Sequence, residues 1–302
     1  MKRICLVLTL VSAAAVAQTM PVAQVPSRST NLRERAAAPS YTDMYCSGFL
    51  SKQSINKSNY VLAGLDTPQQ TQFSQGDTIY LEGSGYQEGA RFSVLRELRD
   101  PNVSDFYPGQ RAAVASVGQP YGERGRVRVI AVRDKVAIAQ VEFSCSDIVA
   151  GDLVVPFEEK PSIQFRPAQK FDQFPTGPTN VTARIVMAHE FDTVVAPGQK
   201  VYLNVGADKG VKIGDYFRVV RGYDPAKGHR VEALAYKMPY ADDTQKTPLK
   251  VPPGKYASLP RHVVAEMIVL NVTATSATAM ITNAVEHVNV GDTVELEGGN
   301  QQ

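Results

Sequence analysis

Short stretches of alternating hydrophobic and polar residues recur along the chain, and glycine-containing turns separate them. In residues 198–221, Val201 and Leu203 alternate with polar neighbours, and apolar residues resume after an interruption at Phe217, Val219 and Val220. Alternation with a period of two is typical of half-buried strands, and glycine tolerates the backbone angles of tight turns. The segment therefore predicts two strands joined by a turn with three glycines, which are Gly206, Gly210 and Gly214.

The same strand–turn–strand plan occurs earlier in the chain, at residues 76–96. Each copy is followed by a matched block that starts at Gly125 or at Ala265 and reaches a Gly-Asp pair at the same distance. Between these ends the apolar positions correspond without a gap, as in Val129 with Val269. The sequence therefore predicts two copies of one small β module.

We assign the recurring glycines and aspartates to turns rather than to a ligand site. Glycine adopts positive φ without strain, and an aspartate side chain accepts hydrogen bonds from nearby backbone amides. Both properties are needed where a strand reverses. The predicted turn residues are Gly151, Asp152, Gly206, Gly210, Gly214, Asp215, Gly291 and Asp292.

The expected fold class is all-β, with two tandem small β modules and long loop insertions. Residues 44–50 predict the first strand, 100–122 a loop, 222–261 a second long insertion and 288–296 the last strand. The predicted boundaries are a signal peptide at 1–17, a disordered leader at 18–40, β module 1 at 41–160, a Pro-rich linker at 161–180, β module 2 at 181–297 and a tail at 298–302.

The N-terminus has the three parts of a secretory signal peptide. Lys2 and Arg3 form a charged start, residues 4–11 are apolar, and Ala15-Val16-Ala17 fits a cleavage site. The apolar run is short for a stable membrane span, although an uncleaved anchor is the alternative. We expect a secreted protein with no transmembrane segment after cleavage.

Cleavage would change the charge of the chain. The full chain has 32 basic and 30 acidic residues, and the signal peptide carries two of the basic ones, Lys2 and Arg3. The mature chain is then neutral, so we expect no global attraction to nucleic acid.

Cleavage would also remove Cys5 and leave Cys46 and Cys145. An even pair of cysteines in an exported protein predicts one disulfide, and two buried free thiols are the alternative. Two cysteines without a nearby histidine pair cannot complete the tetrahedral site that zinc prefers, so no metal is expected.

Two motifs approach known active sites without completing them. Residues 83–89 miss the dinucleotide-binding fingerprint by one position and precede a strand rather than a helix. His189-Glu190 begins like a zinc-protease motif, but the second histidine is missing. We expect no enzyme, no catalytic residues and no cofactor. The alternative is a hydrolase in which His189 or His262 lies near a carboxylate and a nucleophile.

One repeated feature suggests a binding surface. Arg96 and Arg221 each end the strand after the glycine turn, and each precedes a long insertion, 100–122 or 222–261. Tyrosine is enriched at protein interfaces, and both insertions contain it. The expected surface comprises Arg96, Arg221, Tyr223, Tyr236, Tyr240 and Tyr256, with Tyr107 and Tyr121 in the first insertion; solvated arginines at strand ends are the alternative.

The glycine-punctuated pattern at 206–219, with the VNVGDTV ending at 288–294, resembles the C-terminal domain of the flagellar assembly protein T family. The first module is similar to the region that follows LysM repeats in some bacterial envelope proteins, through Gly76-Asp77, the strand at 92–96 and the ending at 148–156. The resemblance implies small β-barrel-like modules in a periplasmic or outer-envelope protein, and together with the signal peptide it implies secretion across the inner membrane.

We therefore expect a secreted, non-catalytic bacterial envelope protein that acts by protein–protein contact in an assembly. Its partners would be other envelope proteins. The alternative is a cell-wall or polysaccharide-binding protein that uses tyrosine-rich loops to bind cell-wall glycan.

Overall fold

The structure is a computed structural model that describes residues 38–65, 71–134, 136–165, 173–175, 179–222, 255 and 259–297. Its first half contains α1 (Tyr41–Tyr45), β1 (Phe49–Ser51), β2 (Tyr60–Gly64), β3 (Thr78–Glu82), β4 (Arg91–Glu97), α2 (Gln110–Val117), β5 (Gln119–Arg133), β6 (Val136–Ser144) and β7 (Leu153–Pro156). Its second half contains β8 (Thr182–Ala188), β9 (Val194–Val195), β10 (Lys200–Leu203), the 3-10 helix η1 (Ala207–Lys209), β11 (Tyr216–Arg221), β12 (His262–Val272), β13 (Ala277–Ala284), β14 (Val288–Asn289) and β15 (Thr293–Leu296).

The strands form two closed antiparallel barrels of the predicted all-β, tandem type. In barrel 1 the strand order is β5–β4–β7–β2–β3–β6, and β6 pairs back to β5. In barrel 2 the order is β12–β11–β15–β8–β10–β13, and the ring is again closed. Closure leaves no unpaired strand edge within either ring.

Apolar side chains fill each barrel because the strands alternate between inward and outward positions. In β3, Ile79 and Leu81 are buried while their neighbours are partly exposed. Full burial of such a side chain contributes roughly 1.5–3 kcal/mol. The two barrels have separate cores, one centred on residues such as Val127 and Val129 and the other on residues such as Phe217 and Met267.

The two barrels repeat each other at the level of single residues. Arg128 lies opposite Arg91 on one side and Gln140 on the other. In barrel 2, Ile268 lies in the same way between Tyr216 and Met280. β-bulges occur after Arg126 in β5 and after Glu266 in β12, which are equivalent positions. The structure therefore confirms two tandem copies of one module.

Four Gly-Asp turns share one geometry. Each aspartate donates its backbone N–H to the carbonyl three residues earlier, and its carboxylate accepts a 2.8 Å hydrogen bond from that residue's N–H. The glycine before it has φ between +91° and +103°, which an L side chain rarely adopts. These pairs are Gly76-Asp77, Gly151-Asp152, Gly214-Asp215 and Gly291-Asp292.

Gly206 and Gly210 flank η1. Gly210 has φ +81°, and a Cβ added at Gly206 would collide with the backbone carbonyls of Thr273 and Ala274. The loop therefore lies against the β12–β13 turn so closely that only glycine fits at this point.

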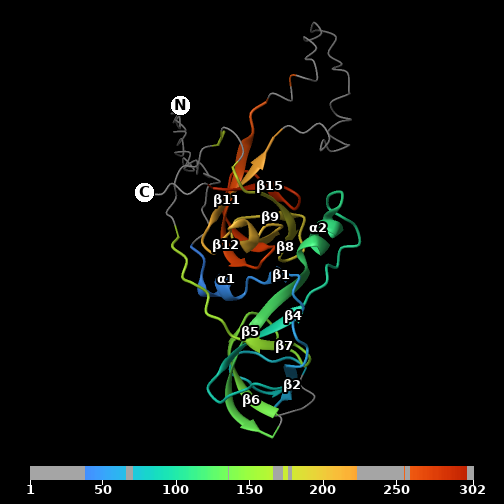
Figure 1. Cartoon of the computed structure of the whole chain (residues 1–302), viewed down its shortest axis with the longest axis vertical. Helices are drawn as coiled ribbons and strands as arrows, with labels where there is room; N and C mark the ends of the chain where they lie inside the picture. The colour runs from blue at the N-terminus through green and yellow to red at the C-terminus, as the bar shows by residue number, and fades with distance from the viewer. Residues whose placement is uncertain are drawn as a thin grey trace, which may run out of the picture. The chain divides into compact units, whose positions relative to one another are not determined.

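Segments before and within barrel 1 pack on barrel 2. β1 pairs with the first residues of β5 and also contacts β13. The Leu50 carbonyl accepts hydrogen bonds from Thr273 Oγ1 at 2.9 Å and Ser276 Oγ at 2.7 Å. α2 contacts β8, and the long β5 strand runs from the end of α2 into barrel 1 (Figure 1). Leu50 and Val117 share a buried cluster with Val186, Met187 and Tyr202 of barrel 2.

Three predicted elements differ from the structure. Residues 44–45 belong to α1 rather than to a strand, because Ser40 and Asp43 form a capping box that starts a helix. The predicted loop 100–122 contains α2 and the start of β5. The predicted last strand 288–296 is divided into β14 and β15 by the turn at Gly291-Asp292.

The predicted disulfide is present between Cys46 and Cys145. It joins the end of α1 to the residue after β6, across a sequence separation of 99. Among the helices of the described residues, none is long and apolar enough to cross a membrane. The predicted signal peptide lies outside the described residues, as does nearly all of the predicted leader.

Candidate functional site

A group of arginines lies on the outer side of barrel 1, where β4, β5 and β6 are neighbours. Val127 and Val129 of β5 point into the core, so the alternation places Arg126 and Arg128 outside. The strand register places Arg91 and Gln140 beside Arg128. We name the surface of Arg91, Arg126, Arg128, Gln140 and Glu142 the arginine face.

Glu142 is the acidic centre of the arginine face. Its Oε2 lies 2.9 Å from Arg91 Nε and 3.1 Å from Arg126 Nε, and its Oε1 pairs with Arg128. Burial alone would raise the pKa of Glu142, but hydrogen bonding to Arg91 and the charges of the three arginines lower it below the usual value. Three positive charges surround one negative charge, so the face has an excess of positive charge.

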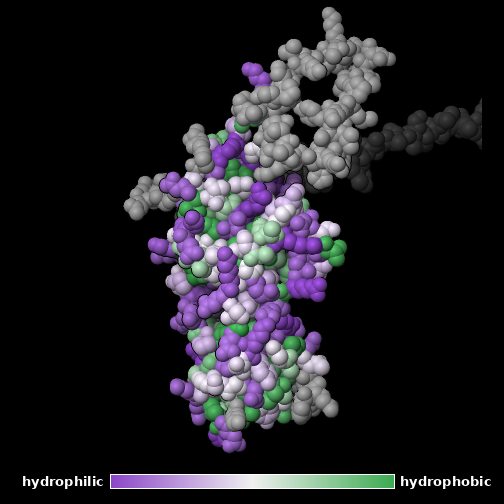
Figure 2. Space-filling view, turned by 45° about the vertical axis from the view of Figure 1, so that its right-hand side comes forward, coloured by the Kyte–Doolittle hydropathy of each residue, from purple (hydrophilic) through white to green (hydrophobic). Residues whose placement is uncertain are grey.

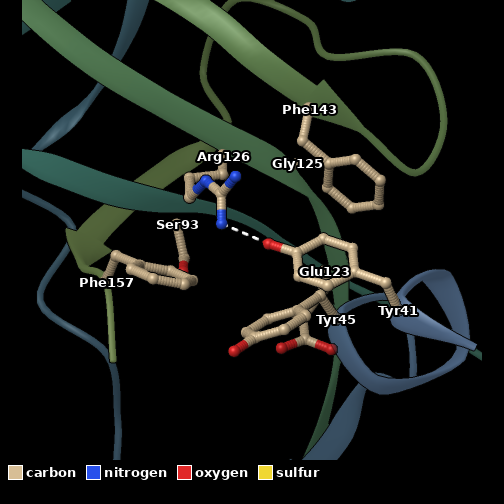
Figure 3. A pocket seen from close by; sticks show the side chains of 8 residues that line it. All are labelled: Tyr41, Tyr45, Ser93, Glu123, Gly125, Arg126, Phe143 and Phe157. Carbon is tan, nitrogen blue, oxygen red and sulfur yellow. Dashed lines mark hydrogen bonds between the residues drawn. The ribbon is translucent and has the colours of Figure 1, made fainter. Parts of the chain in front are cut away.

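Arg126 also lies in an aromatic pocket (Figure 3). Its guanidinium carbon is 4.9 Å from the ring centre of Phe157 and 5.7 Å from that of Tyr41, both within the range of cation–π attraction. It donates a hydrogen bond to the Tyr41 hydroxyl, and Tyr45 and Phe143 complete the aromatic lining. The remaining cavity is ≈ 10 Å³, about the volume that one water molecule requires.

The arginine face opens into a larger hollow next to the aromatic pocket. This hollow has a volume of ≈ 430 Å³, and its lining includes Gln75, Arg91, Arg126, Gln140 and Glu142. The side chains of Arg91 and Arg128 are 42% and 43% exposed, so both are available to a ligand in solvent. The arginine face is therefore our candidate functional site.

A buried ion pair fixes the chain beside this site. Lys160 Nζ lies 2.7 Å from Glu123 Oε1 and donates to the Met44 carbonyl at 2.6 Å. The other carboxylate oxygen of Glu123 accepts hydrogen bonds from the backbone N–H groups of Ser47 and Gly48. Both charged side chains are nearly buried, and such a pair holds its segments in place only while both partners are present.

Arg96 and Arg221 bind the Gly-Asp turns of their own barrels. Arg96 forms a bidentate pair with Asp152, at 2.6 and 2.8 Å, and donates to the Asp147 carbonyl. Arg221 forms the equivalent pair with Asp292, at 3.2 and 2.7 Å. Both guanidinium groups are mostly buried, so each arginine joins the end of one strand to the turn before another.

The first insertion lies against barrel 2. Gln110 Nε2 donates to the Val186 carbonyl at 3.1 Å, and Asn102 Nδ2 donates to the Phe191 carbonyl at 2.9 Å. Tyr107 packs against the core of barrel 2, and Tyr121 is buried in barrel 1. The other predicted surface tyrosines, Tyr223, Tyr236, Tyr240 and Tyr256, lie outside the described residues.

Each of the two candidate catalytic histidines lies beside a carboxylate. His189 Nδ1 is 2.8 Å from Glu190, and His262 Nε2 is 3.4 Å from Glu286, which also pairs with Arg221. A search of the described residues finds no group of three or more histidines, cysteines and acidic residues that could hold a metal ion.

The arginine face was not among the residues singled out from the sequence. The alternation of β5 already places Arg126 and Arg128 on the polar side, but it gives no partner for them. Glu142 could be added only through the register of β5 with β6, which bulges shift at two points. Tyr41 comes from a helix that the sequence pattern did not predict.

A search of known protein families found no match to this chain, and no curated protein matches it either. The resemblance to the C-terminal domain of flagellar assembly protein T, and to the region after LysM repeats, therefore stays a prediction.

Proposed function

We propose that this protein is a secreted, non-catalytic component of the bacterial cell envelope that acts by protein–protein contact in an assembly. In this proposal the outer surfaces of the two barrels bind polypeptide segments. It assigns the protein to the periplasm or to the outer envelope.

One observation supports this proposal above all. The outer face of barrel 2 holds polypeptide from elsewhere in the same chain. Met44 of α1 forms a buried cluster with Tyr216, Ile268 and Met280, and residues 163 and 165 of the segment after barrel 1 pack against it. A face of this module is thus suited to binding a short segment of protein chain.

The disulfide supports an extracytoplasmic location. Disulfides persist in oxidising compartments such as the bacterial periplasm and are rare in the cytosol. The bond between Cys46 and Cys145 holds α1 against barrel 1, and α1 in turn contacts β12 of barrel 2. An oxidising compartment would keep this arrangement intact.

Site-specific photo-crosslinking in cells tests the proposal. A photoreactive amino acid would replace Ile130 on barrel 1 or Val194 in β9, which are 45% and 50% exposed. We expect a discrete adduct with another envelope protein from at least one position. Folded, oxidised protein that gives no adduct at either position would contradict the proposal.

A second candidate function is binding of cell-wall polysaccharide. The aromatic pocket favours it, because Tyr41 is 49% exposed at the edge of a group of aromatic rings and polar side chains. Saturable retention on purified cell-wall sacculi, lost on Tyr41→Ala, would support this candidate. Retention that does not saturate would contradict it.

A further inference from the structure

The repeat allows the same surface to be compared in the two barrels. Arg91, Arg128 and Gln140 of barrel 1 occupy the positions of Tyr216, Ile268 and Met280 in barrel 2, as the strand registers show. The positions are equivalent, but the chemistry differs. In barrel 2 the three side chains are a tyrosine, an isoleucine and a methionine, and all are buried. In barrel 1 they are cationic or polar; Arg91 and Gln140 are exposed, and Arg128 is partly exposed.

The surface of barrel 2 is buried because chain segments cover it. Met44 from α1 lies in the cluster, and Ile163 and Phe165 pack against it. Met44 precedes barrel 1 in sequence, and Ile163 and Phe165 lie in the segment between barrel 1 and barrel 2. In barrel 2, the outer side of β11, β12 and β13, which correspond to β4, β5 and β6, is therefore a binding surface for polypeptide.

In barrel 1 the equivalent surface, at Arg91, Arg128 and Gln140, is open and positively charged. Within the described part of the chain, Arg91 and Arg128 meet Glu142 through Nε, and their terminal nitrogens make no hydrogen bond. A guanidinium group presents planar donors that match a carboxylate in bidentate geometry. The hollow of ≈ 430 Å³, which Arg91, Arg126 and Gln140 help to line, has room for side chains of a ligand.

We infer that the arginine face is the docking site for an acidic, extended segment of a partner protein. The segment would occupy the position that residues 163 and 165 and α1 occupy on barrel 2, with carboxylates in place of apolar side chains. The inference rests on the proposed function and names the chemistry of its partner. Glu142 already shows how a carboxylate is bound on this face, and a ligand would use the outer donors of Arg91 and Arg128.

Fluorescence anisotropy with a labelled octaglutamate peptide tests the inference on the oxidised, full-length protein. We expect saturable binding that weakens by about tenfold or more in the double variant Arg91→Glu/Arg128→Glu, because close charge pairs become repulsive. The matched control is Arg99→Glu/Arg133→Glu, which makes the same charge change at two exposed arginines elsewhere on module 1. Its affinity should stay close to that of the unmodified protein at moderate salt, because exposed charges beyond the Debye length are screened.

A third variant predicts the opposite effect. Glu142→Gln removes the internal carboxylate that competes for the arginines, so octaglutamate should bind more tightly. If Arg91→Glu/Arg128→Glu does not fold, the neutral pair Arg91→Gln/Arg128→Gln serves instead, and circular dichroism and urea unfolding check each variant. Equal weakening by both charge-reversed double variants, or no saturable binding, would overturn the inference.

Two further outcomes would assign the face to another occupant. Competition by polygalacturonate at much lower concentration than by octaglutamate would identify a polysaccharide site and overturn the peptide site. A change of sedimentation coefficient in Arg91→Glu/Arg128→Glu would identify contact between copies of this chain. A crosslinked partner whose yield is unaffected by this variant would leave the proposed function standing and refute only the arginine face.

Discussion

At the scale of the residue, the Gly-Asp pairs combine a backbone requirement with a side-chain requirement. The glycine provides positive φ, and the aspartate closes the turn through its own N–H and its carboxylate. Four turns share this geometry, but their surroundings differ. Matched substitutions at these turns can therefore separate the free-energy cost of backbone strain, steric collision, the turn hydrogen bond and the ion pair.

The glycines Gly151 and Gly291 form one matched pair. Replacement of Gly151 by alanine should destabilise the protein by about 1–2 kcal/mol, because φ is +91° and alanine is strained there. The space around the new Cβ is open, so no collision adds to this cost. Gly291→Ala should cost more, because the new Cβ would lie 2.7 Å from the Tyr107 ring. Urea unfolding measures both. If Tyr107→Ala does not remove the excess cost of Gly291→Ala, the collision is not its cause.

The aspartates Asp77 and Asp152 form a second pair. Both accept a backbone hydrogen bond in their turn, but Asp152 also binds Arg96. Asp77→Ala should cost about 1 kcal/mol, as for a typical hydrogen bond. Asp152→Ala should cost about 3 kcal/mol or more, because the mostly buried Arg96 loses its partner. Equal free energies of unfolding for the two variants would show that the ion pair adds nothing to stability.

Glu142 gives the arginine face a dependence on pH. Burial opposes its ionisation, but Arg91 and the other arginines lower its pKa below the usual 4.5. A carboxyl group whose pKa is lower in the folded than in the unfolded protein stabilises the fold fully above its unfolded-state pKa. This stabilisation is lost as the pH falls through the folded-state pKa. Glu142→Gln should therefore destabilise the protein at pH 7 more than at pH 3. Chemical denaturation at both pH values checks this, and an equal cost would refute it.

At the scale of the element, most strands follow from sequence pattern. The predicted strand–turn–strand plan at 76–96 contains β3 and β4, because alternation marks the strands and Gly76, Gly83 and Gly89 lie in the turns beside them. The repeat extends this success, since the apolar positions of β5 and β6 correspond to those of β12 and β13. Periodicity could not show that the strands close into rings, because it does not give the pairing.

The two helices that the sequence pattern did not predict are short, and both pack on barrel 2. α1 has five residues, too few for a periodic pattern, and it packs through Met44 on barrel 2. α2 begins at Gly109 without a side-chain cap and is held by Gln110 and Val117 against barrel 2. The arginine face could not be predicted either, because Arg126 and Glu142 meet only through strand register.

β1 is the element that joins the two barrels most directly. Leu50 is fully buried in the cluster shared with barrel 2, whereas Leu81 is fully buried inside barrel 1. Leu50→Ala and Leu81→Ala should each cost about 2–5 kcal/mol. Only Leu50→Ala should separate the unfolding of the two barrels into two calorimetric transitions. The same number of transitions in both variants would show that β1 does not couple the barrels.

At the scale of the whole molecule, the contacts between modules do not depend on the chain that connects them. α1, β1 and α2 contact barrel 2 from positions that precede barrel 2 by many residues. A protease site introduced at residues 176–178, inside the predicted linker, should therefore yield two fragments that still elute together in size-exclusion chromatography. They should separate in denaturant, and separation in native buffer would refute the prediction.

The position of β1 against barrel 2 also determines when this strand can complete its contacts during folding. The Leu50 carbonyl is bound by Ser276, a residue 226 positions later. The surroundings of β1 can therefore be completed only when the chain as far as Ser276 is available for folding. Until then the outer edge of β1 has unpaired carbonyl groups, and such long-range closure is slow because it needs contacts between distant parts of the chain. β1, the first strand of the described residues, is thus among the last to reach its final environment.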